Sequence, residues 1–422
     1  MIKDTILQHK IEKEKILSES YILREKLDFA KNFLNQDLIK VIMGPRRSGK
    51  SVFSFLLLKN KNFAYLNFDD ENLLKIENND DIIKSILDVY SKPDFILFDE
   101  IQNLKNWELF VNKLKRRGFN LILTGSNSKL LSKEFGTALT GRYIPIKIFP
   151  FSFKEFLTAK KVELDEKYME IPETRGKILN YLDEYLNNGG FPEIVTKNID
   201  PKVYLGTLFD SILLTDIVKR HSVKLTQKLY DLSSYMISTF SSEFSFASLR
   251  KNLDFNSTNT VQIYIKYLEE SYLMFTLNRF DFKIKKQIKT KKKCYIVDNG
   301  FIHAKSFQFS QNTGKLMENL VFNEILRKDY KLNQDIFYYK TRNDKEIDFV
   351  LKKAITLETL IQVCYDIDDP KTYKRETDAL IEASEELNCD DLLIITWDNE
   401  KRENIKGKKI NFIPLWKWLL KI

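Results

Sequence analysis

A short glycine-containing stretch near the start of the chain combines residue types and a spacing suited to phosphate binding. It reads GPRRSGKS and fits the pattern G-x-x-x-x-G-K-S, ending in Lys50 and Ser51. Glycines let the backbone curl with its N–H groups inward, and the N-terminus of a following helix adds partial positive charge. A lysine at this place reaches the β- and γ-phosphates, and the serine hydroxyl binds Mg²⁺. We predict that the rest of the loop binds the phosphates: Gly44, Pro45, Arg46, Arg47, Ser48 and Gly49.

Two adjacent acids follow an apolar run further along the chain. Asp99 and Glu100 end the segment FILFDE. At the carboxyl end of a strand, an aspartate can hold Mg²⁺ through water and a glutamate can polarise the attacking water. Acids after a strand are also common helix N-caps. Beside the glycine loop, however, the pair predicts hydrolysis of the nucleotide, with Asp99 at the metal and Glu100 as the catalytic carboxylate.

Polar residues after two further apolar runs add candidates. In LILTGSNSKLL, Ser126 or Asn127 can lie near the γ-phosphate and position water, or Asn127 or Ser128 can cap the next helix. Arg142 stands just before YIPIKIF. It can act as an arginine finger on the nucleotide of a neighbouring subunit, which predicts a homo-oligomer. The alternative for Arg142 is a structural salt bridge at the start of a strand.

Five short apolar segments must position these residues, and each is expected to form a strand. They are LIKVIM (38–43), FAYLNF (63–68), FILF (95–98), NLILTG (120–125) and YIPIKIF (143–149). Continuous apolar strands that alternate with helices indicate a parallel sheet buried on both faces. In an AAA+-like sheet, the strand at 120–125 would lie between the first and the third. Residues 1–150 are therefore predicted to form an α/β P-loop core that begins with helical sequence over residues 1–36.

The remainder of the chain is predicted to form three further domains. Residues 151–223 are helical, with a turn at NNGGFPE, and form a lid-like helical extension. Residues 224–305 form three helices and a hairpin, the order of a winged helix. Residues 306–422 return to a small α/β domain that begins with a helix.

The predicted hairpin is rich in lysine. Its lysines are Lys283, Lys285, Lys286, Lys289, Lys291, Lys292 and Lys293. Lysines that neutralise phosphates give nucleic-acid binding that weakens steeply with salt. The third helix carries Glu269 and Glu270 and few side chains suited to base edges, so backbone contact is expected rather than sequence readout. A protein–protein role for the winged helix stays open.

Composition restricts the class of protein. The formal charge is +9 and the pI about 9.0, which favours an anionic partner such as nucleic acid, although a lysine-rich solvated surface also explains it. The cysteines Cys294, Cys364 and Cys389 are scattered and form no CxxC pair, so no disulfide framework or zinc site is expected. We find no signal-peptide core and no apolar run long enough for a membrane span. The expected location is therefore the cytoplasm.

The order of these motifs resembles that of archaeal-type ATPases, which are AAA+-like P-loop proteins also found in bacteria. The segments that carry the resemblance are VIMGPRRSGKS, FAYLNFDDENL, FILFDEIQNLKNWELFVNKL, LILTGSNSKLLS, LTGRYIPIKIFPFSFKEF and NNGGFPEIV. The resemblance covers nearly the whole chain. It implies ATP as the nucleotide, a helical extension, a winged helix and a C-terminal restriction-nuclease-like domain. For single residues it implies Lys50 and Ser51 at nucleotide and metal, Asp99 at Mg²⁺, Glu100 at water and Arg142 as finger.

The C-terminal domain departs from the nuclease pattern that the resemblance implies. Such a domain places a helix carboxylate, a strand aspartate and an acid-x-lysine pair around Mg²⁺. Glu318 and Asp348 supply the first two, but the third element reads Gln362-Val363-Cys364. A cysteine cannot replace an ammonium group. Two cations from elsewhere in the fold remain possible substitutes, namely Lys345 and Arg375. We therefore expect a binding or docking module that lacks nuclease catalysis.

The sequence thus predicts a Mg²⁺-dependent ATPase that couples ATP binding and hydrolysis to conformational change, acting on nucleic acid through the winged helix and basic hairpin. One alternative is a nucleotide-dependent binding switch for a protein partner, with slow turnover. Another is an ATP-driven nuclease. The preference for ATP over GTP depends on the resemblance alone.

Overall fold

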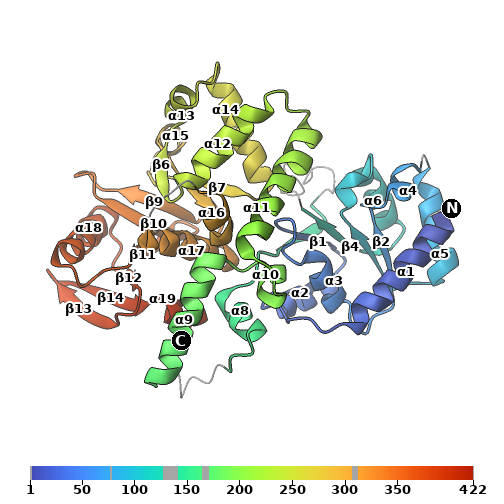
Figure 1. Cartoon of the computed structure of the whole chain (residues 1–422), viewed down its shortest axis with the longest axis horizontal. Coiled ribbons are helices and arrows are strands. Elements are labelled where there is room, and N and C mark those ends of the chain that lie inside the picture. The colour runs from blue at the N-terminus through green and yellow to red at the C-terminus, as the bar shows by residue number, and fades with distance from the viewer. Residues whose placement is uncertain (1, 77, 127–140, 164–170, 307–311, 422) are drawn as a thin grey trace. The chain divides into compact units, whose positions relative to one another are not determined.

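The computed structural model describes residues 2–76, 78–126, 141–163, 171–306 and 312–421 (Figure 1). The chain divides into two compact units. One comprises residues 1–151 with 270–272, and the other residues 152–269 with 273–422. Across the described ranges, no helix is both long and apolar enough to cross a membrane.

The first unit is built on a five-stranded parallel sheet. Its strands are β1 (Ile39–Met43), β2 (Phe63–Asn67), β3 (Phe95–Asp99), β4 (Asn120–Gly125) and β5 (Tyr143–Lys147). Their spatial order is β2-β3-β4-β1-β5, and every neighbouring pair is parallel. The prediction that the strand at 120–125 lies between the first and third is confirmed. The carboxyl ends of β1, β3 and β4 therefore meet at one edge of the sheet.

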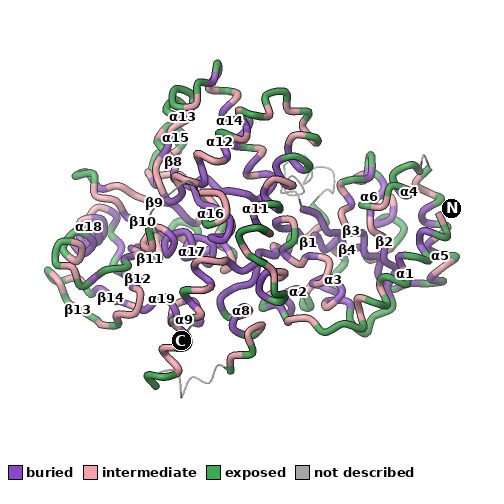
Figure 2. Tube along the Cα trace, in the orientation of Figure 1, coloured by how far each residue is buried: buried purple, intermediate pink, exposed green. Residues whose placement is uncertain are grey.

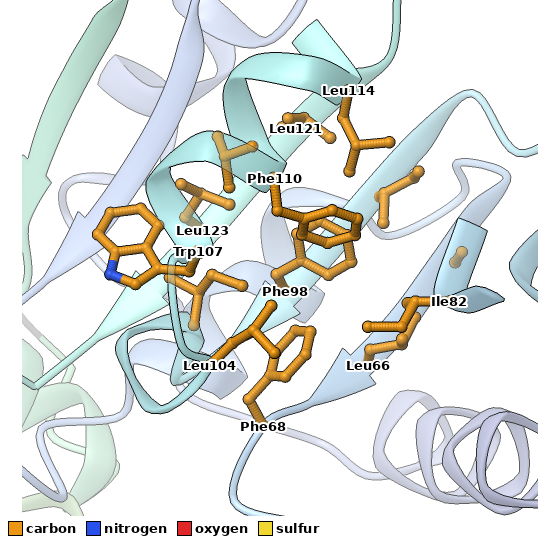
Figure 3. Packing of buried hydrophobic residues seen from close by; sticks show 14 of the residues in the cluster. Leu66, Phe68, Ile82, Phe98, Leu104, Trp107, Phe110, Leu114, Leu121 and Leu123 are labelled. Atoms are coloured by element: carbon orange, nitrogen blue, oxygen red, sulfur yellow. The ribbon is translucent and has the colours of Figure 1, made fainter. Parts of the chain in front are cut away.

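Helices cover both faces of this sheet. They are α1 (Ile2–Ser18), α2 (Leu27–Leu34), α3 (Lys50–Leu57), α4 (Glu71–Leu74), α5 (Asn79–Tyr90) and α6 (Trp107–Arg116). Side chains alternate along each strand: Leu121 and Leu123 join the cluster that contains Phe98 and Phe110, whereas Ile122 joins the cluster on the other face (Figure 3). β1 and β3 are consequently buried along their whole length, and β2 and β4 along all but one residue, whereas the edge strand β5 is only partly buried (Figure 2). Burial on both faces explains why the sequence shows continuous apolar runs.

Helix α1 covers the edge of the sheet formed by β2. Ile6 is fully buried in the core, and Lys13 Nζ donates a hydrogen bond to the Phe63 carbonyl at 2.9 Å. The sequence led us to expect helix throughout residues 1–36. The chain instead leaves the helical conformation between Ser18 and Leu27, and this connection carries Arg24 to the nucleotide loop.

The second unit begins with helices that include α8 (Phe153–Ala159), α9 (Pro172–Asn188), α10 (Pro192–Thr196), α11 (Pro201–Ser211) and a π-helical turn, Ile212–Lys219. The turn between α9 and α10 contains Gly189 and Gly190. A Cβ atom on Gly189 would lie 1.7 Å from Asp298 Oδ1, and Gly190 N donates to Asp298 Oδ2 at 2.8 Å. The glycine at 189 is thus required by the close approach of a carboxylate.

Three helices and a three-stranded antiparallel sheet follow. The elements are α12 (Thr226–Ser238), β6 (Ser242–Phe244), α13 (Phe246–Asn252), α14 (Thr258–Glu270), β7 (Met274–Asn278), α15 (Ile284–Lys289) and β8 (Lys292–Ile296). The strand order is β6-β8-β7. The three predicted helices are confirmed. The predicted hairpin is correct in its two strands, but its connection contains the short helix α15.

A six-stranded mixed sheet completes the second unit. Its elements, with their helices, are α16 (Asn299–Lys305), α17 (Thr313–Arg327), β9 (Ile336–Lys340), β10 (Glu346–Lys353), β11 (Thr356–Cys364), α18 (Pro370–Leu387), β12 (Leu392–Thr396), β13 (Lys401–Ile405), β14 (Lys408–Pro414) and α19 (Leu415–Leu420). The order is β13-β14-β12-β11-β10-β9. The division of this part of the chain into separate domains at residues 151–223, 224–305 and 306–422 stays a prediction, since all three segments fall mainly in one compact unit.

Candidate nucleotide site and a buried carboxylate–lysine network

The glycine loop joins the carboxyl end of β1 to the start of α3, which is the predicted strand–loop–helix context. Gly44 has φ +154°, and a Cβ atom there would lie 1.9 Å from the Ile148 carbonyl oxygen, so only glycine fits. Gly49 has φ +88° and directly precedes α3. Lys50 is 4% exposed, and its Nζ donates to the Pro45 carbonyl at 3.0 Å. In the rest of the loop, Ser48 is buried, Arg46 half-buried and Arg47 exposed.

Asp99 is the last residue of β3, and the Ser51 side chain is near enough to act to lower the pKa of its carboxyl. Thr124 donates a hydrogen bond to Asp99 Oδ1. Burial, with the nearby charge of Glu100, raises the pKa of Asp99 to about 6. A serine hydroxyl and a carboxylate side by side at the base of a phosphate loop suit Mg²⁺, which prefers oxygen ligands. Ser51 and Asp99 therefore fit the predicted metal site.

Glu100 faces the loop lysine. Its Oε1 lies 3.7 Å from Lys50 Nζ. Its Oε2 accepts hydrogen bonds from Ser126 Oγ at 3.1 Å, from Ser126 N at 3.3 Å, and from the Gln102 side chain. Burial acts to raise the pKa of Glu100, but the charge of Lys50 and these hydrogen bonds outweigh it and lower the pKa. The carboxylate is therefore ionised at neutral pH, as a group that polarises water must be.

The remaining predicted residues fall in three different places. Ser126 is 4% exposed and lies at this site, whereas Asn127 and Ser128 lie outside the described residues. Arg142 is exposed and precedes β5, and its carbonyl accepts a hydrogen bond from Ile39 N at 3.0 Å. It lies at the amino ends of the strands, separated from the carboxyl edge by five residues, or about 16 Å. Arg142 cannot reach the nucleotide site of its own P-loop, so its predicted role concerns a neighbouring copy.

Two residues at the nucleotide site were missed from the sequence. Thr124 is fully buried and, besides donating to Asp99, accepts a hydrogen bond from Glu100 N at 3.0 Å. Its place at the carboxyl end of a predicted strand was a usable signal. Arg24 gave no such signal, because it precedes the loop by a whole helix.

Arg24 braces the phosphate loop. Its Nη1 donates to the Ser48 carbonyl at 3.0 Å and its Nη2 to the Phe149 carbonyl at 2.6 Å. The guanidinium lies 5.0 Å from the centre of the Phe151 ring and is 8% exposed. One side chain thus connects the glycine loop to the segment that follows β5.

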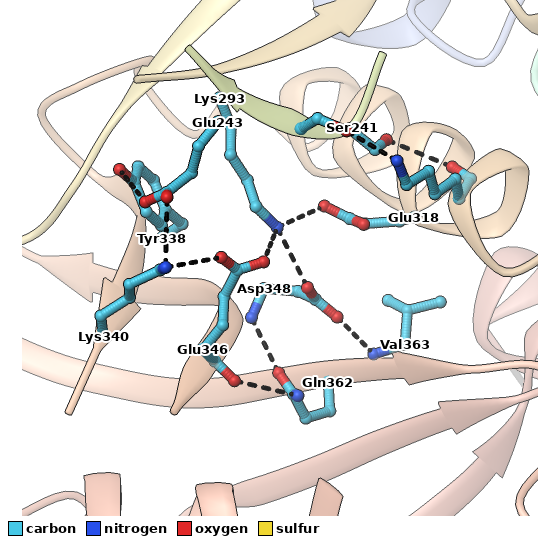
Figure 4. A network of polar contacts seen from close by, with 12 residues as sticks. Ser241, Glu243, Lys293, Glu318, Tyr338, Lys340, Glu346, Asp348, Gln362 and Val363 are labelled. Carbon is cyan, nitrogen blue, oxygen red and sulfur yellow. Dashed lines mark hydrogen bonds and ion pairs between the residues drawn. The ribbon is translucent and has the colours of Figure 1, made fainter. Parts of the chain in front are cut away.

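A second polar cluster lies in the other unit and centres on Lys293 of β8 (Figure 4). This lysine is 1% exposed, and its Nζ lies 2.8 Å from Glu318 Oε1, 2.7 Å from Glu346 Oε1 and 3.2 Å from Asp348 Oδ1. Tyr295, two residues further along the same strand face, donates to Glu318 Oε1 at 2.6 Å. Burial acts to lower the pKa of Lys293, but the carboxylates outweigh it and raise the pKa. We call this set the carboxylate–lysine network.

The network corrects one prediction about the basic segment. Lys293 was expected to contact phosphates, but its strand face turns it into the protein, where carboxylates neutralise it. Lys292 is also partly buried, and its ammonium donates to the Asn278 side chain. Five lysines of the segment are exposed: Lys283, Lys285, Lys286, Lys289 and Lys291.

The predicted nuclease-like residues come together in the same network. Glu318 and Asp348 face Lys293, while Gln362 Oε1 accepts a hydrogen bond from Asp348 N at 2.8 Å and its Nε2 donates to Glu376. Neither predicted substitute cation takes the lysine position. Lys345 pairs with Glu382 at 3.1 Å, and Arg375 pairs with Glu376 at 2.6 Å. A pocket of about 870 Å³ adjoins these residues.

Comparison with known proteins agrees with this architecture. Residues 36–157 match the model of the AAA domain, and residues 179–312 and 313–418 match two domains of unknown function, DUF8612 and DUF4143. The parallel sheet with its glycine loop, together with the AAA match, identifies residues 36–157 as a P-loop NTPase-like core of the AAA type. The nuclease-like character of the C-terminal part stays a prediction, because its matching domain has no assigned function.

Two relatives align over nearly the whole chain. An uncharacterized protein of Methanocaldococcus jannaschii is 36% identical over 96% of this chain and 96% of its own length. An uncharacterized protein of Haemophilus influenzae is 31% identical over 95% of this chain and 99% of its own. The chain belongs to the family of AAA-domain proteins that contains these two relatives.

Similarities to solved structures are more distant. The Walker-type ATPase PABY2304 of Pyrococcus abyssi aligns with 68% of this chain and 96% of its own, at 15% identity and a TM-score of 0.41. The ORC1 protein of Aeropyrum pernix, in complex with DNA, aligns with 75% of this chain and 97% of its own, at 11% identity and a TM-score of 0.31.

Proposed function

We propose that the protein is a Mg²⁺-dependent ATPase. The observation that carries the proposal is the convergence of two pairs at one edge of the sheet. Ser51 lies near Asp99, and Lys50 Nζ lies 3.7 Å from Glu100 Oε1. The first pair would hold Mg²⁺, which supplies charge neutralisation at the phosphates. Lys50 would bind the β- and γ-phosphates.

Glu100 is proposed to polarise the attacking water. Its carboxylate is held by Ser126 and Gln102 on one oxygen, which leaves the other oxygen facing Lys50. Three anchoring hydrogen bonds fix the carboxylate in one orientation, and a fixed general base needs no reorganisation during the reaction. Ser126 is therefore assigned as a positioning residue for Glu100.

We propose further that hydrolysis is coupled to movement through the segment after β5. Ile148 N donates to the Met43 carbonyl at 2.7 Å, and the Ile148 carbonyl packs against Gly44. Arg24 links the Ser48 and Phe149 carbonyls. The first unit ends at Phe151, so the chain that contacts the glycine loop continues directly into the second unit. A change at the loop can thus be transmitted along a short covalent path.

The proposed partner is nucleic acid, bound through residues 224–305. The helices α12, α13 and α14 with the antiparallel sheet β6-β8-β7 follow the order of a winged helix, which supports this assignment. The exposed lysines of the segment between β7 and β8 supply positive charge for phosphates. The mixed-sheet domain is proposed to act as a non-catalytic module, because its third element, Gln362-Val363-Cys364, lacks the acid and the lysine of the nuclease pattern.

Steady-state ATP hydrolysis, measured with and without DNA, tests the proposal. Wild-type protein should hydrolyse ATP only with Mg²⁺, and DNA should stimulate the rate less as salt rises. Lys50→Ala serves as the control and should bind no ATP. Retained ATP affinity in Lys50→Ala would refute the assignment of the loop. Very slow hydrolysis that DNA leaves unchanged would instead favour a nucleotide-dependent switch for a protein partner.

Supercoiled plasmid incubated with Mg²⁺ or Mn²⁺ tests the non-catalytic assignment of the C-terminal domain. No nicking is expected. Nicking that disappears in Asp348→Ala, in protein that remains folded, would show that the domain is a nuclease.

A further inference from the structure

The segment between β7 and β8 exposes large apolar side chains as well as lysines. Phe282 is 76% exposed, Ile284 72% and Ile288 66%. Helix α15, which carries both isoleucines, has no buried residue. Ile284 and Ile288 are four residues apart, so they share one face of this helix. Exposed apolar groups gathered in one short segment mark an interaction site more often than isolated ones do.

The segment is firmly anchored at both ends by one residue of β9. The Tyr338 carbonyl accepts a hydrogen bond from Phe280 N at 2.7 Å, and the Tyr338 hydroxyl donates to the Lys291 carbonyl at 2.7 Å. Phe280 packs in the core with its ring 5.5 Å from that of Phe337, and the Phe282 ring lies 5.2 Å from the Phe280 ring. The exposed apolar side chains therefore lie on a segment whose two ends are fixed to the core.

The segment is also held within itself. Gln287 Nε2 donates to the Asp281 carbonyl at 2.6 Å, and Lys283 N donates to Asp281 Oδ1 at 2.8 Å. Positive charge surrounds the apolar groups, because all five exposed lysines of the segment lie between residues 283 and 291. A partner for this surface must offer negative charge and apolar area at the same time.

Nucleic-acid strands differ in how well they meet that requirement. A duplex presents phosphates, but the faces of its bases are covered by stacking. A single strand presents phosphates together with unstacked base faces, and proteins bind such strands with basic side chains beside aromatic groups on which bases stack. Aliphatic side chains that contact base faces in a duplex must first unstack the bases, a cost that an already unstacked single strand does not carry. The chemistry of residues 282–291 therefore matches a single strand better than a duplex.

We propose that residues 282–291 bind single-stranded nucleic acid, with the exposed lysines at the phosphates and Phe282, Ile284 and Ile288 against unstacked bases. This inference rests on the proposed function, which assigns nucleic acid as the partner of this part of the chain. It adds the class of strand and a specific role for the three apolar side chains.

Fluorescence anisotropy of the full chain tests the inference, using labelled oligo-dT and a labelled duplex of the same length. Wild-type protein should bind the single strand more tightly. Phe282→Ala should weaken single-strand binding about tenfold, because one base stacked on an aromatic ring contributes this much. Ile288→Ser should weaken single-strand binding as well, and neither change should alter duplex binding. Ile355→Ser is the matched control, because Ile355 is 98% exposed and lies in the turn between β10 and β11.

The lysines are tested separately. Lys285→Gln with Lys289→Gln should weaken binding to both oligonucleotides and flatten the salt dependence, with the exposed Lys353→Gln as control. Equal affinity for both strands, unchanged by Phe282→Ala but reduced by the lysine variant, would overturn the inference while leaving nucleic-acid binding intact. Absence of binding to either oligonucleotide would overturn both proposals, and binding to phosphatidylserine vesicles in that case would identify a lipid surface as the partner. Circular dichroism melting checks that each variant is folded.

Discussion

Lys293 donates a hydrogen bond to Glu318 across 2.8 Å, so a residue of the basic segment neutralises the helix carboxylate of the C-terminal domain. Glu346 and Asp348 complete the set of carboxylates around the same ammonium group. Lys293 lies on β8 and Asp348 on β10, so the ion pairs join the three-stranded sheet to the mixed sheet. The network therefore stabilises the packing of these two sheets within the second unit.

Lys293→Met should destabilise the second unit. Removal of one partner from a buried ion pair leaves uncompensated charge and typically costs about 3–5 kcal/mol. Urea unfolding followed by circular dichroism measures the loss, and Lys285→Met is the control, because Lys285 is exposed. A loss below about 1 kcal/mol, equal to that of the control, would show that the carboxylates find other partners.

Glu100→Gln should separate ATP binding from hydrolysis. The amide keeps the size and can keep a hydrogen bond from Ser126, but it cannot accept a proton from water. We expect ATP affinity within about threefold of wild type and a kcat lowered by about 10²–10⁴-fold. Equilibrium binding and steady-state kinetics provide the two readouts. Near-normal turnover would show that a group other than Glu100 polarises the attacking water.

Arg24→Met should weaken ATP binding while the sheet remains folded. The change removes two hydrogen bonds from a buried guanidinium to loop carbonyls, and each bond to a charged group contributes about 1.5–3 kcal/mol. If part of this energy holds the glycine loop in its binding conformation, ATP affinity falls by tenfold or more. The ATP affinity of Arg24→Lys should lie between those of wild type and Arg24→Met, since a lysine can reach one of the two carbonyls. Lys31→Gln, an exposed change on α2, is the control; ATP affinity equal to that of the control would rule out bracing of the loop.

Asp298 should give the unfolding free energy a measurable dependence on pH. Burial raises the pKa of this carboxyl from 3.8 to about 6, despite hydrogen bonds from Gly190 N and Gly300 N. Between pH 4 and pH 6 the folded state therefore binds more protons than the unfolded state at this site, and stability falls as the pH rises, by about 3 kcal/mol in all. The unfolding free energy of Asp298→Asn should lack this part of the dependence on pH. Urea unfolding at a series of pH values makes the comparison, and identical slopes would show that Asp298 titrates normally.

Arg142 should act only between copies of the chain. Because it lies at the edge of the sheet opposite the glycine loop, a finger role requires a neighbour. Specific ATPase activity should then rise with protein concentration, and Arg142→Ala should abolish that rise with little change in ATP affinity. Activity per molecule that stays constant over a hundredfold range of concentration would favour the structural alternative.

The sheet and the edge that carries the candidate site could be predicted from sequence because each depends on local patterns. The five strands of the first unit are continuous apolar runs, and the glycine spacing specifies the loop between β1 and α3. The hairpin of β13 and β14 was missed, since β13 (KRENI) has one apolar residue, Ile405, and the apolar residues of β14 stand beside lysines and an asparagine. Such short, largely polar strands give a weak signal.

Tertiary contacts decide the rest, and a single sequence does not encode them locally. Lys293 differs from its exposed neighbours only in the face of β8 on which it lies and in the pairing of that strand. Likewise, Arg24 reaches the nucleotide loop because the chain turns between α1 and α2. Neither residue belongs to a recognisable motif.

Because Arg24 holds the glycine loop, the segment needed for ATPase activity is expected to be longer than the segment that the AAA match recognises. The AAA match begins at residue 36, yet the arginine that fixes the Ser48 carbonyl lies before that point, as does α1, whose Ile6 is fully buried in the core. A boundary drawn by similarity would keep every nucleotide-binding side chain and remove the part that sets the shape of the loop. In this family, swapping AAA cores between relatives would therefore succeed only if the segment upstream of the match is exchanged as well.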